Sequence, residues 1–560
     1  MNRRTLYRLH AWIGLNLGLL LFVICLSGTL AVFSAELAWL GNRDLRAGQS
    51  PAAPAPAFSW QAMHDRVAAA HPHAAILYLV APGGGHAVAR ALVAYSPRDL
   101  RTVPYDPNSG EVRAARGSFG LASFLRIFHK QFYIVPDNFG FHGTLVVGLL
   151  GAFLLVTVIA GLLSLRRWWR ALVLLRRGRG RRLFWSDLHR MAGVWSLLVG
   201  VLLSVTGIWY FAEIVLEQSR LLPHDPPSLQ AENLQTRPAV LQPVDLDLVA
   251  AQVRQVWPQF EPRQIALPAR PGQPLVLTGQ GEAWLVRDRA NRVEIDPYSG
   301  HILRRQPATG LDPLRRWAET ADPLHFGSFG GLATRILWFA AGLALCAGIL
   351  AGLYTAWLRI RQALPHRPAV SWPRALLAML PTLAILAASL HGTWAYAIAP
   401  ARSLQQERRV QPLGEDRIGP WQVETVRIAG GDAGVIEIRF RDGHANFREA
   451  SLRPAGADTP LPLLRLADRL RLDMAAAGCA GPCRLELAIA AWDGSRHTAA
   501  LVIPAAAAGG GEVLPPPRGM ATGELAILLL AVALMALPLP GWLWLQAAMP
   551  RGPASRKKRS

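Results

Sequence analysis

The sequence is poor in charged residues and in cysteine for its length. Of its 560 residues, 17% are charged and 51% are hydrophobic, whereas an ordinary soluble protein carries roughly 25% charged residues. Few charges and many long apolar runs argue against a nucleic-acid-binding protein and against disorder. Four cysteines are too few for a disulfide scaffold. The chain also lacks a phosphate-binding Gly-x-x-x-x-Gly-Lys loop, a convincing dinucleotide fingerprint, a Gly-x-Ser-x-Gly elbow and a His-Glu-x-x-His zinc motif.

The apolar runs are long enough to cross a membrane. A transmembrane helix needs about 20 mostly apolar residues. Six stretches qualify: Ala11–Phe33, Phe141–Leu165, Met191–Phe211, Leu332–Trp357, Ala375–Ile398 and Leu525–Ala548. The first is longer than the apolar core of a typical signal peptide, so we expect it to remain as a helix.

The excess of basic residues predicts the direction of these spans. The formal net charge is +22, and Arg and Lys gather in short segments that would share one side of the membrane. These segments are the N-terminus, 166–187, 358–374 and 549–560. Short basic loops stay in the cytoplasm. We therefore expect cytoplasmic termini, lipid headgroups as the partner of these charges, and the long segments 34–140, 212–330 and 399–521 on the outer side.

The predicted fold is a membrane α-helical bundle of six spans with outer domains. The outer parts carry short alternating apolar and polar runs between Pro and Gly, typical of α+β or β domains; Val435–Phe440 and Arg484–Trp492 are strand-like. The expected parts are span one (1–40), an α+β domain (41–140), span two (141–165), a basic loop (166–187), span three (188–213), a second α+β domain (214–330), span four (331–358), span five (374–398), a β-rich domain (399–521), span six (522–548) and a basic tail (549–560).

The first two thirds of the chain predict an internal duplication. His10 precedes Gly28 by the same number of residues by which His189 precedes Gly207. Each half then has a helix-like stretch, strands and an Asp-Pro-x-Ser-Gly turn, at 106–110 and at 296–300. Each half returns to the membrane after a further histidine, His129 or His325. Spans five and six lie outside the repeat.

The recurring histidines suggest two haems. His10 and His189 fall at the cytoplasmic ends of spans one and three, and His129 and His325 near the outer ends of spans two and four. Ionisable groups at membrane depth are costly and usually functional. Two imidazoles on one haem iron fill both axial positions and favour electron transfer.

Several assignments stay open from the residues alone. His142 competes with His129 as the partner of His325, although the repeat favours His129. Gly14, Gly28, Gly193 and Gly207 would let a helix or a flat macrocycle approach closely, and plain helix packing explains them equally well. In the β-rich segment, Cys479 and Cys483 predict a structural disulfide, since that segment is expected in an oxidising compartment; a redox-active pair is the alternative.

The motifs resemble those of the PepSY-associated transmembrane proteins, which are bacterial inner-membrane proteins linked to iron uptake. The resemblance covers about residues 1–360 and rests on 8–14 with 26–28, 128–132, 187–193 with 206–207, 323–327, and the turns at 106–110 and 296–300. It implies that the outer α+β domains are periplasmic PepSY modules. Spans five and six and the Cys-containing domain depart from the four-span core of the family.

Within this family the chain looks similar to ferric-siderophore reductases of the FoxB type. That resemblance implies two b-type haems, a ferric siderophore as the substrate, and reduction of its iron on the periplasmic side of the inner membrane. The cytoplasmic loops are too short for a flavin domain, so a cytoplasmic reductase or a membrane quinol would have to supply the electrons. The alternatives are a non-enzymatic membrane regulator that binds a protein partner, and a siderophore transporter.

Overall fold

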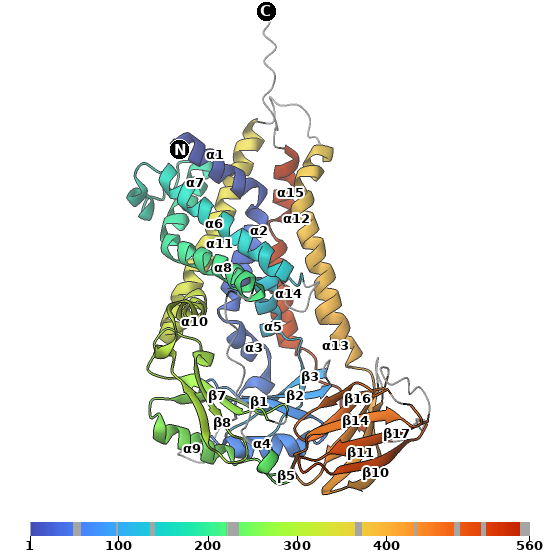
Figure 1. The fold of residues 1–560 in the computed structure, drawn as a ribbon. Helices are drawn as coiled ribbons and strands as arrows, with labels where there is room; N and C mark the ends of the chain where they lie inside the picture. Colours follow the sequence, from blue (N-terminus) through green and yellow to red (C-terminus); the bar gives the residue numbers. More distant parts are fainter. Residues whose placement is uncertain are drawn as a thin grey trace, which may run out of the picture.

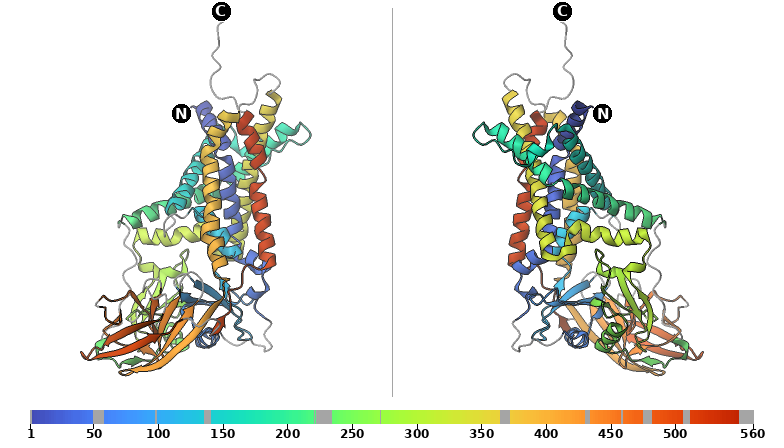
Figure 2. Two further views of the ribbon diagram at one scale, coloured as in Figure 1. Left: turned by 90° about the vertical axis from the view of Figure 1, so that its right-hand side faces the viewer. Right: turned by 90° about the vertical axis from the view of Figure 1, so that its left-hand side faces the viewer.

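The computed structural model describes residues 2–48, 58–96, 99–134, 141–219, 221, 234–270, 272–363, 372–429, 434–457, 459–474, 482–505 and 511–548. Helices form a bundle at one end of the molecule, and the β-strands lie at the other (Figure 1). The two side views in Figure 2 show the same separation. We call these the α1 end, where helix α1 (Arg3–Asn16) begins, and the sheet end.

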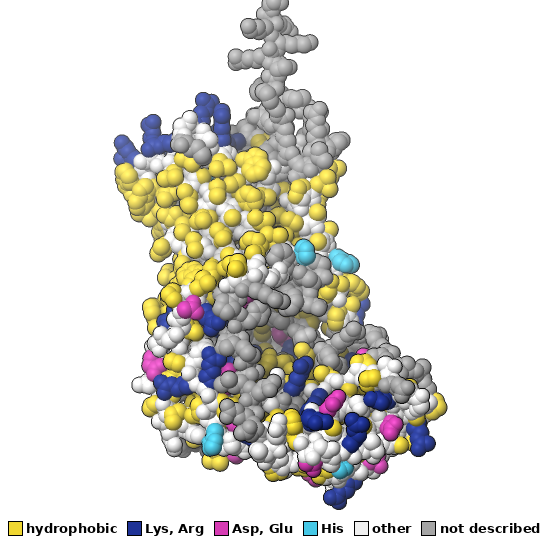
Figure 3. Space-filling model, in the orientation of Figure 1, with side chains coloured by type: hydrophobic (Ala, Val, Ile, Leu, Met, Phe, Trp, Pro, Cys, Tyr) yellow, Lys and Arg dark blue, Asp and Glu magenta, His cyan; other side chains and the backbone are white. Residues whose placement is uncertain are grey.

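All six predicted spans fall on helices. Within the described residues, five helices are long and apolar enough to cross a bilayer, and a bent pair makes a sixth candidate. They are α6 (Phe141–Ser164), α8 (Leu197–Gln218), α11 (Gly331–Ala363), α12 (Trp372–Thr393) with its continuation to Ser403, α14 (Thr522–Ala536) with α15 (Leu539–Ala548), and the bent pair α1 with α2 (Gly18–Ala31). Their apolar side chains form a band around the visible face of the bundle, with basic side chains beyond it at the α1 end (Figure 3). The chain is therefore a membrane protein.

The first predicted span is broken, and not one continuous helix. Helices α1 and α2 meet at an angle of 72° at Leu17. Asn16 donates its side-chain amide to the carbonyl of Trp12 at 2.7 Å, a local bond of the kind that competes with helix continuation. The Leu15 carbonyl accepts instead from Trp542 Nε1 at 2.9 Å and from Gln546 Nε2 at 2.6 Å, both on α15. Polar side chains from another span thus satisfy a backbone group that the break leaves open.

The helices of the two halves make matching contacts. In the first half, α1 packs on α6, and α2 packs on α5 (Leu121–Gln131) and on α11. In the second half, α7 (Arg181–Trp195) packs on α11, and α8 packs on α10 (Pro313–Phe326) and on α6. Each half therefore contributes a span that packs against the other half.

The strands of the two outer α+β segments form one antiparallel sheet. Its order is β4-β3-β2-β1-β6-β7-β8-β9. The bounds are β1 (Ala75–Val80), β2 (Ala89–Ser96), β3 (Asp99–Tyr105), β4 (Arg116–Gly117), β6 (Glu261–Ala266), β7 (Leu275–Gln280), β8 (Asn291–Ile295) and β9 (Ile302–Gln306). The halves join where Leu79 of β1 pairs with Ile265 of β6. The predicted helix-like stretches are α4 (Trp60–Ala70) and α9 (Leu246–Val256), whose apolar residues share the core of this sheet.

The two Asp-Pro-x-Ser-Gly turns are confirmed. In each turn the aspartate side chain, Asp106 or Asp296, accepts a hydrogen bond from the backbone N–H two residues further on. The closing glycines, Gly110 and Gly300, have φ angles of 70° and 76°, a region that favours glycine. The second turn connects β8 to β9, which pair antiparallel.

The third outer segment is a β-rich domain with a core of its own. One sheet contains β10 (Arg408–Ile418), β11 (Trp421–Ala429), β12 (Val435–Phe440), β15 (Leu463–Arg465), β16 (Arg469–Asp473) and β19 (Glu512–Leu514). A second contains β14 (Glu449–Pro454), β17 (Cys483–Ala490) and β18 (Arg496–Ile503), and a short pair joins β13 (His444–Ala445) to β5 (Val240–Leu241). Both strand-like stretches are confirmed as β12 and β17. Cys479 lies outside the described residues, so its pairing with Cys483 stays a prediction.

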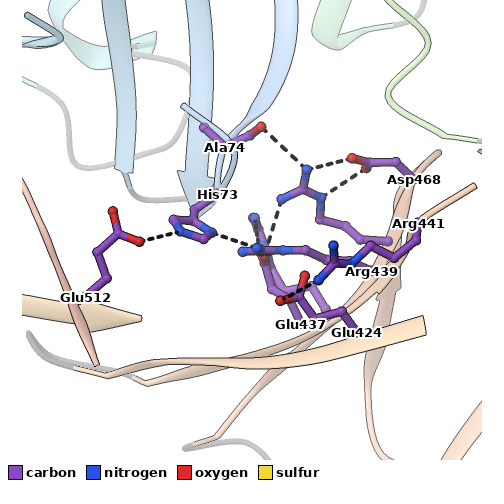
Figure 4. A network of polar contacts seen from close by, with 10 residues as sticks. His73, Ala74, Glu424, Glu437, Arg439, Arg441, Asp468 and Glu512 are labelled. Carbon is purple, nitrogen blue, oxygen red and sulfur yellow. Dashed lines mark hydrogen bonds and ion pairs between the residues drawn. The ribbon is translucent and has the colours of Figure 1, made fainter. Parts of the chain in front are cut away.

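A buried ion cluster lies where the β-rich domain meets the first sheet (Figure 4). The fully buried carboxylate of Glu437 accepts hydrogen bonds from Arg439, Arg469 and Arg471. Arg439 Nη1 lies 2.6 Å from Nδ1 of His73, which directly precedes the strand region of the first sheet. Burial alone would raise the pKa of Glu437, but the charges of the arginines outweigh it and hold the pKa below its ordinary value.

Replacing Glu437 by leucine is expected to destabilise the protein strongly. The change leaves three buried arginines without their shared carboxylate, and removal of one partner from a buried ion cluster costs about 3–5 kcal/mol. The measurement is thermal unfolding of the solubilised protein followed by tryptophan fluorescence. Glu424→Gln is the matched control, because Glu424 pairs with the half-exposed Arg441 and such pairs contribute about 0–1 kcal/mol. Equal unfolding temperatures for both variants would contradict this assignment.

Candidate functional site

The structure brings the four repeat histidines together in two pairs. His129 on α5 and His325 on α10 face each other, with 3.5 Å between their Nε2 atoms and 5.8 Å between their ring centres. His10 on α1 and His189 on α7 have ring centres 5.7 Å apart. We call these the sheet-end pair and the α1-end pair. Each pair takes one histidine from each half of the chain.

In the sheet-end pair, both rings are held through Nδ1. His129 Nδ1 lies 3.1 Å from the Ile24 carbonyl, which can only accept, so this nitrogen donates. His325 Nδ1 lies 2.7 Å from Oγ1 of Thr206. The Thr206 hydroxyl donates to the carbonyl of Leu202 at 2.8 Å, and therefore accepts from His325. Both Nε2 atoms consequently carry lone pairs, and these lone pairs point at each other across 3.5 Å.

The α1-end pair repeats this arrangement. His10 Nδ1 donates to the Thr157 carbonyl at 2.9 Å, and His189 Nδ1 donates to the Gly348 carbonyl at 2.7 Å. These acceptors lie on α6 and α11, the equivalent spans of the two halves. All four histidines thus have the hydrogen-bonded Nδ1 and available Nε2 that are typical of metal-ligating histidine.

Burial keeps the sheet-end histidines neutral. It lowers the pKa of His129 to about 4. It lowers the pKa of His325 to about 3, with a smaller contribution from the neighbouring His129. A neutral imidazole is the form that binds a metal.

Glycines give the histidine rings their space. A Cβ atom at position 28 would lie 2.5 Å from Cε1 of His129, and Cβ atoms at 161 and 352 would lie 3.1 Å and 3.0 Å from the rings of His10 and His189. At Gly14, Gly193 and Gly207 a Cβ atom would meet nothing within 4 Å. Of the glycines singled out in the sequence, Gly28 therefore accommodates a ring directly.

Gly28→Ala is expected to displace His129, because no side chain at 28 fits beside the ring. Gly14→Ala, on the same broken span, is the matched control and is expected to be tolerated. The measurement is the yield of monodisperse protein and its bound cofactor. Normal behaviour of the Gly28→Ala protein would show that the ring can move aside at no cost.

A cavity of about 480 Å³ adjoins the sheet-end pair. Both histidines line it, as do Gly28 and Gly207 of the repeat and further glycines on α6 and α11. The volume lies within the range of about 300–1,000 Å³ that small-molecule and cofactor sites occupy. Apolar groups dominate its wall, and charged side chains of both signs, Arg126, Lys130, Arg287, Glu213 and Asp322, lie along one part of it.

The residues present fit a haem better than a simple metal ion. In the described part of the chain, no group of three or more His, Cys, Asp or Glu side chains could hold a metal. A haem brings its own equatorial ligands and needs two axial ones. Imidazole–metal bonds are about 2.0–2.1 Å long, so a shared metal atom needs opposed Nε2 atoms about 4 Å apart. The sheet-end pair is close to that separation at 3.5 Å.

His142 is not part of either pair. It begins α6 with an exposed side chain and does not line the cavity. His129 is the histidine that faces His325, as the repeat favours.

Sequence reasoning missed the groups that orient the rings. Thr206 and its equivalent Ser27, whose Oγ lies 3.3 Å from His129 Nδ1, were quoted only as repeat markers. Their position directly before Gly28 and Gly207 was the available signal. Gly161 and Gly352 follow the Nδ1-accepting carbonyls of 157 and 348 by the same step in each half. Tyr210, which packs on His325 and donates to Asp322 at 2.6 Å, gave no sequence signal.

Comparison with known proteins identifies the family. The model of the PepSY-associated TM region matches residues 7–359. A Pseudomonas aeruginosa protein named "Uncharacterized protein PA4219" is 28% identical over 264 residues, which are 42% of this chain and 63% of that relative. This chain thus covers less than two thirds of the relative's length. Because the family match spans more than half of the sequence, including all four paired histidines, the chain belongs to the PepSY-associated transmembrane family.

Proposed function

We propose that the protein is a dihaem b-type oxidoreductase of the bacterial inner membrane that passes electrons across the bilayer to a ferric siderophore in the periplasm. The observation that carries this proposal is the presence of two cross-half histidine pairs whose Nδ1 atoms are fixed and whose Nε2 atoms are available. The siderophore as acceptor, and the FoxB type, rest on the sequence resemblance. The donor would be a cytoplasmic reductase or a quinol.

The proposed topology follows from the charges and the ends of the molecule. The basic segment 166–182 and α1 lie at one end, and the sheets lie at the other (Figure 1). The positive-inside rule then makes the α1 end cytoplasmic and the sheet end periplasmic. One histidine pair would lie toward each side of the membrane. The matching contacts of the two halves support an internal duplication.

When bound, haem iron supplies one-electron transfer, and axial imidazoles on both faces favour this over oxygen chemistry. The protein's own groups hold and orient the ligands. The carbonyls of residues 24, 157 and 348 and the Thr206 hydroxyl keep each Nδ1–H engaged, so the imidazoles cannot rotate or take a second tautomer. The apolar cavity wall excludes water from the sheet-end pair.

The test uses vesicles that contain the full chain and a membrane-soluble quinol, with a ferric hydroxamate siderophore and a chromogenic ferrous chelator outside. Ferrous iron should form with the wild type and should fall to the empty-vesicle rate with His129→Ala. His142→Ala should behave as the wild type. Haem-loaded protein that never reduces external ferric siderophore would refute this acceptor, and chain without haem that co-purifies with a protein partner would favour a regulator.

A further inference from the structure

The last span lies outside the family match, which ends at residue 359, and it contacts the first span at both ends. At the sheet end, the carboxylate of Glu524 on α14 is 2% exposed and accepts from Arg116 and, at 3.2 Å, from Nδ2 of Asn42. Helix α14 packs there on α3 (Ser34–Gly41). The backbones of Gly41 and Gly523 are so close that a Cβ atom on either would overlap the other segment.

At the α1 end, α15 supplies the two donors at the break of the first span. Trp542 and Gln546 are 1% and 2% exposed, and both donate to the Leu15 carbonyl. This carbonyl belongs to the helix that carries His10, little more than one turn away. The angle of α1 against α2, and so the place of the His10 ring, depends on where this carbonyl is held.

The second half closes its equivalent break without another span. Helix α7 ends at Ser196, whose own N–H bonds the carbonyls of Ala192 and Val194 and whose hydroxyl donates to Ala192 at 2.7 Å. The equivalent residue of the first half is Leu17, which has no hydroxyl and whose N–H bonds only the Ile13 carbonyl. The donors on α15 thus stand where the first half lacks its own cap.

We propose that the last span is a positioning element for the α1-end pair, with Trp542 and Gln546 as positioning residues for His10. This proposal rests on the dihaem function proposed above. Span six would fix α1 at its 72° angle and thereby hold His10 against His189. The sheet-end pair, whose histidines sit on α5 and α10, does not depend on these two donors.

The test compares the full-length double variant Trp542→Phe with Gln546→Leu against the wild type, because these changes remove both donors and keep most of the volume. Redox titration followed by absorbance, and low-temperature electron paramagnetic resonance, report each haem separately. We expect the midpoint potential and the low-spin signal of one haem to change or be lost, and those of the other to remain. His10→Ala in parallel identifies which signal belongs to the α1-end pair.

Trp544→Phe is the matched control, since Trp544 lies on the same helix and its ring packs on Trp357. Each single variant, Trp542→Phe and Gln546→Leu, removes one donor and tests the proposal if the double variant does not fold. Unchanged signals in the double variant, or in both single variants, would overturn the positioning role. A change in the sheet-end haem as large as in the α1-end haem would also overturn it. A wild type without haem would refute the proposed function itself.

Discussion

The His129→Ala protein is expected to retain about half of the haem absorbance of the wild type, because the sheet-end pair loses one of its two axial ligands while the α1-end pair keeps both. His325→Ala should have the same effect, since Nε2 of each histidine faces the other at 3.5 Å. The double variant should lose no more than either single variant, because the two residues act on one site. The measurement is the reduced-minus-oxidised spectrum per mole of purified chain.

His142→Ala and His391→Ala are the matched controls for this prediction. Both side chains are exposed, and neither lies in a histidine pair. Their spectra should equal that of the wild type. Loss of haem from His142→Ala with retention in His129→Ala would assign the ligand to the wrong helix.

Thr206→Val is expected to weaken haem retention at the sheet-end pair by roughly 10–100-fold, the usual cost of removing a second-shell partner of a ligating histidine. Valine matches threonine in shape but gives His325 Nδ1 no acceptor in place of the hydroxyl 2.7 Å away. The buried ring would then have an unsatisfied N–H, which is itself costly. The measurement is the rate of haem transfer from the purified protein to excess apomyoglobin.

Thr206→Ser keeps the hydroxyl and should restore slow haem loss. Thr355→Val is the matched control on α11, because the Thr355 hydroxyl donates to the carbonyl of Ala351 within its own helix. Equal rates for Thr206→Val and Thr355→Val would show that the contact with His325 does not orient the ligand.

Much of the fold was predictable because its signals are local. The apolar length of each span, the helix-like stretches that became α4 and α9, and the Asp-Pro-x-Ser-Gly turns depend on residues close together in the chain. The break at Leu17 could not be predicted, because its carbonyl donors lie more than 500 residues away on α15. The joining of the two outer segments into one sheet through β1 and β6 is likewise a long-range pairing.

The candidate site was predictable as a set of residues but not as a geometry. Repetition identified His10, His129, His189 and His325, since a duplicated motif marks equivalent positions without any structure. It left His129 and His142 in competition, because distance along the chain does not show that α5 turns its histidine toward α10. The Nδ1 acceptors of His10 and His189 are main-chain carbonyls, and a carbonyl has no sequence signature.

The haem content of the purified wild-type chain tests the central claim most directly. The measurement combines a pyridine haemochrome assay with the dithionite-reduced spectrum and electron paramagnetic resonance of the oxidised protein. The account predicts b-type haem at about two per chain, with low-spin signals from iron held by two imidazoles. A fully folded protein whose reduced spectrum shows no b-type haem bands would contradict it.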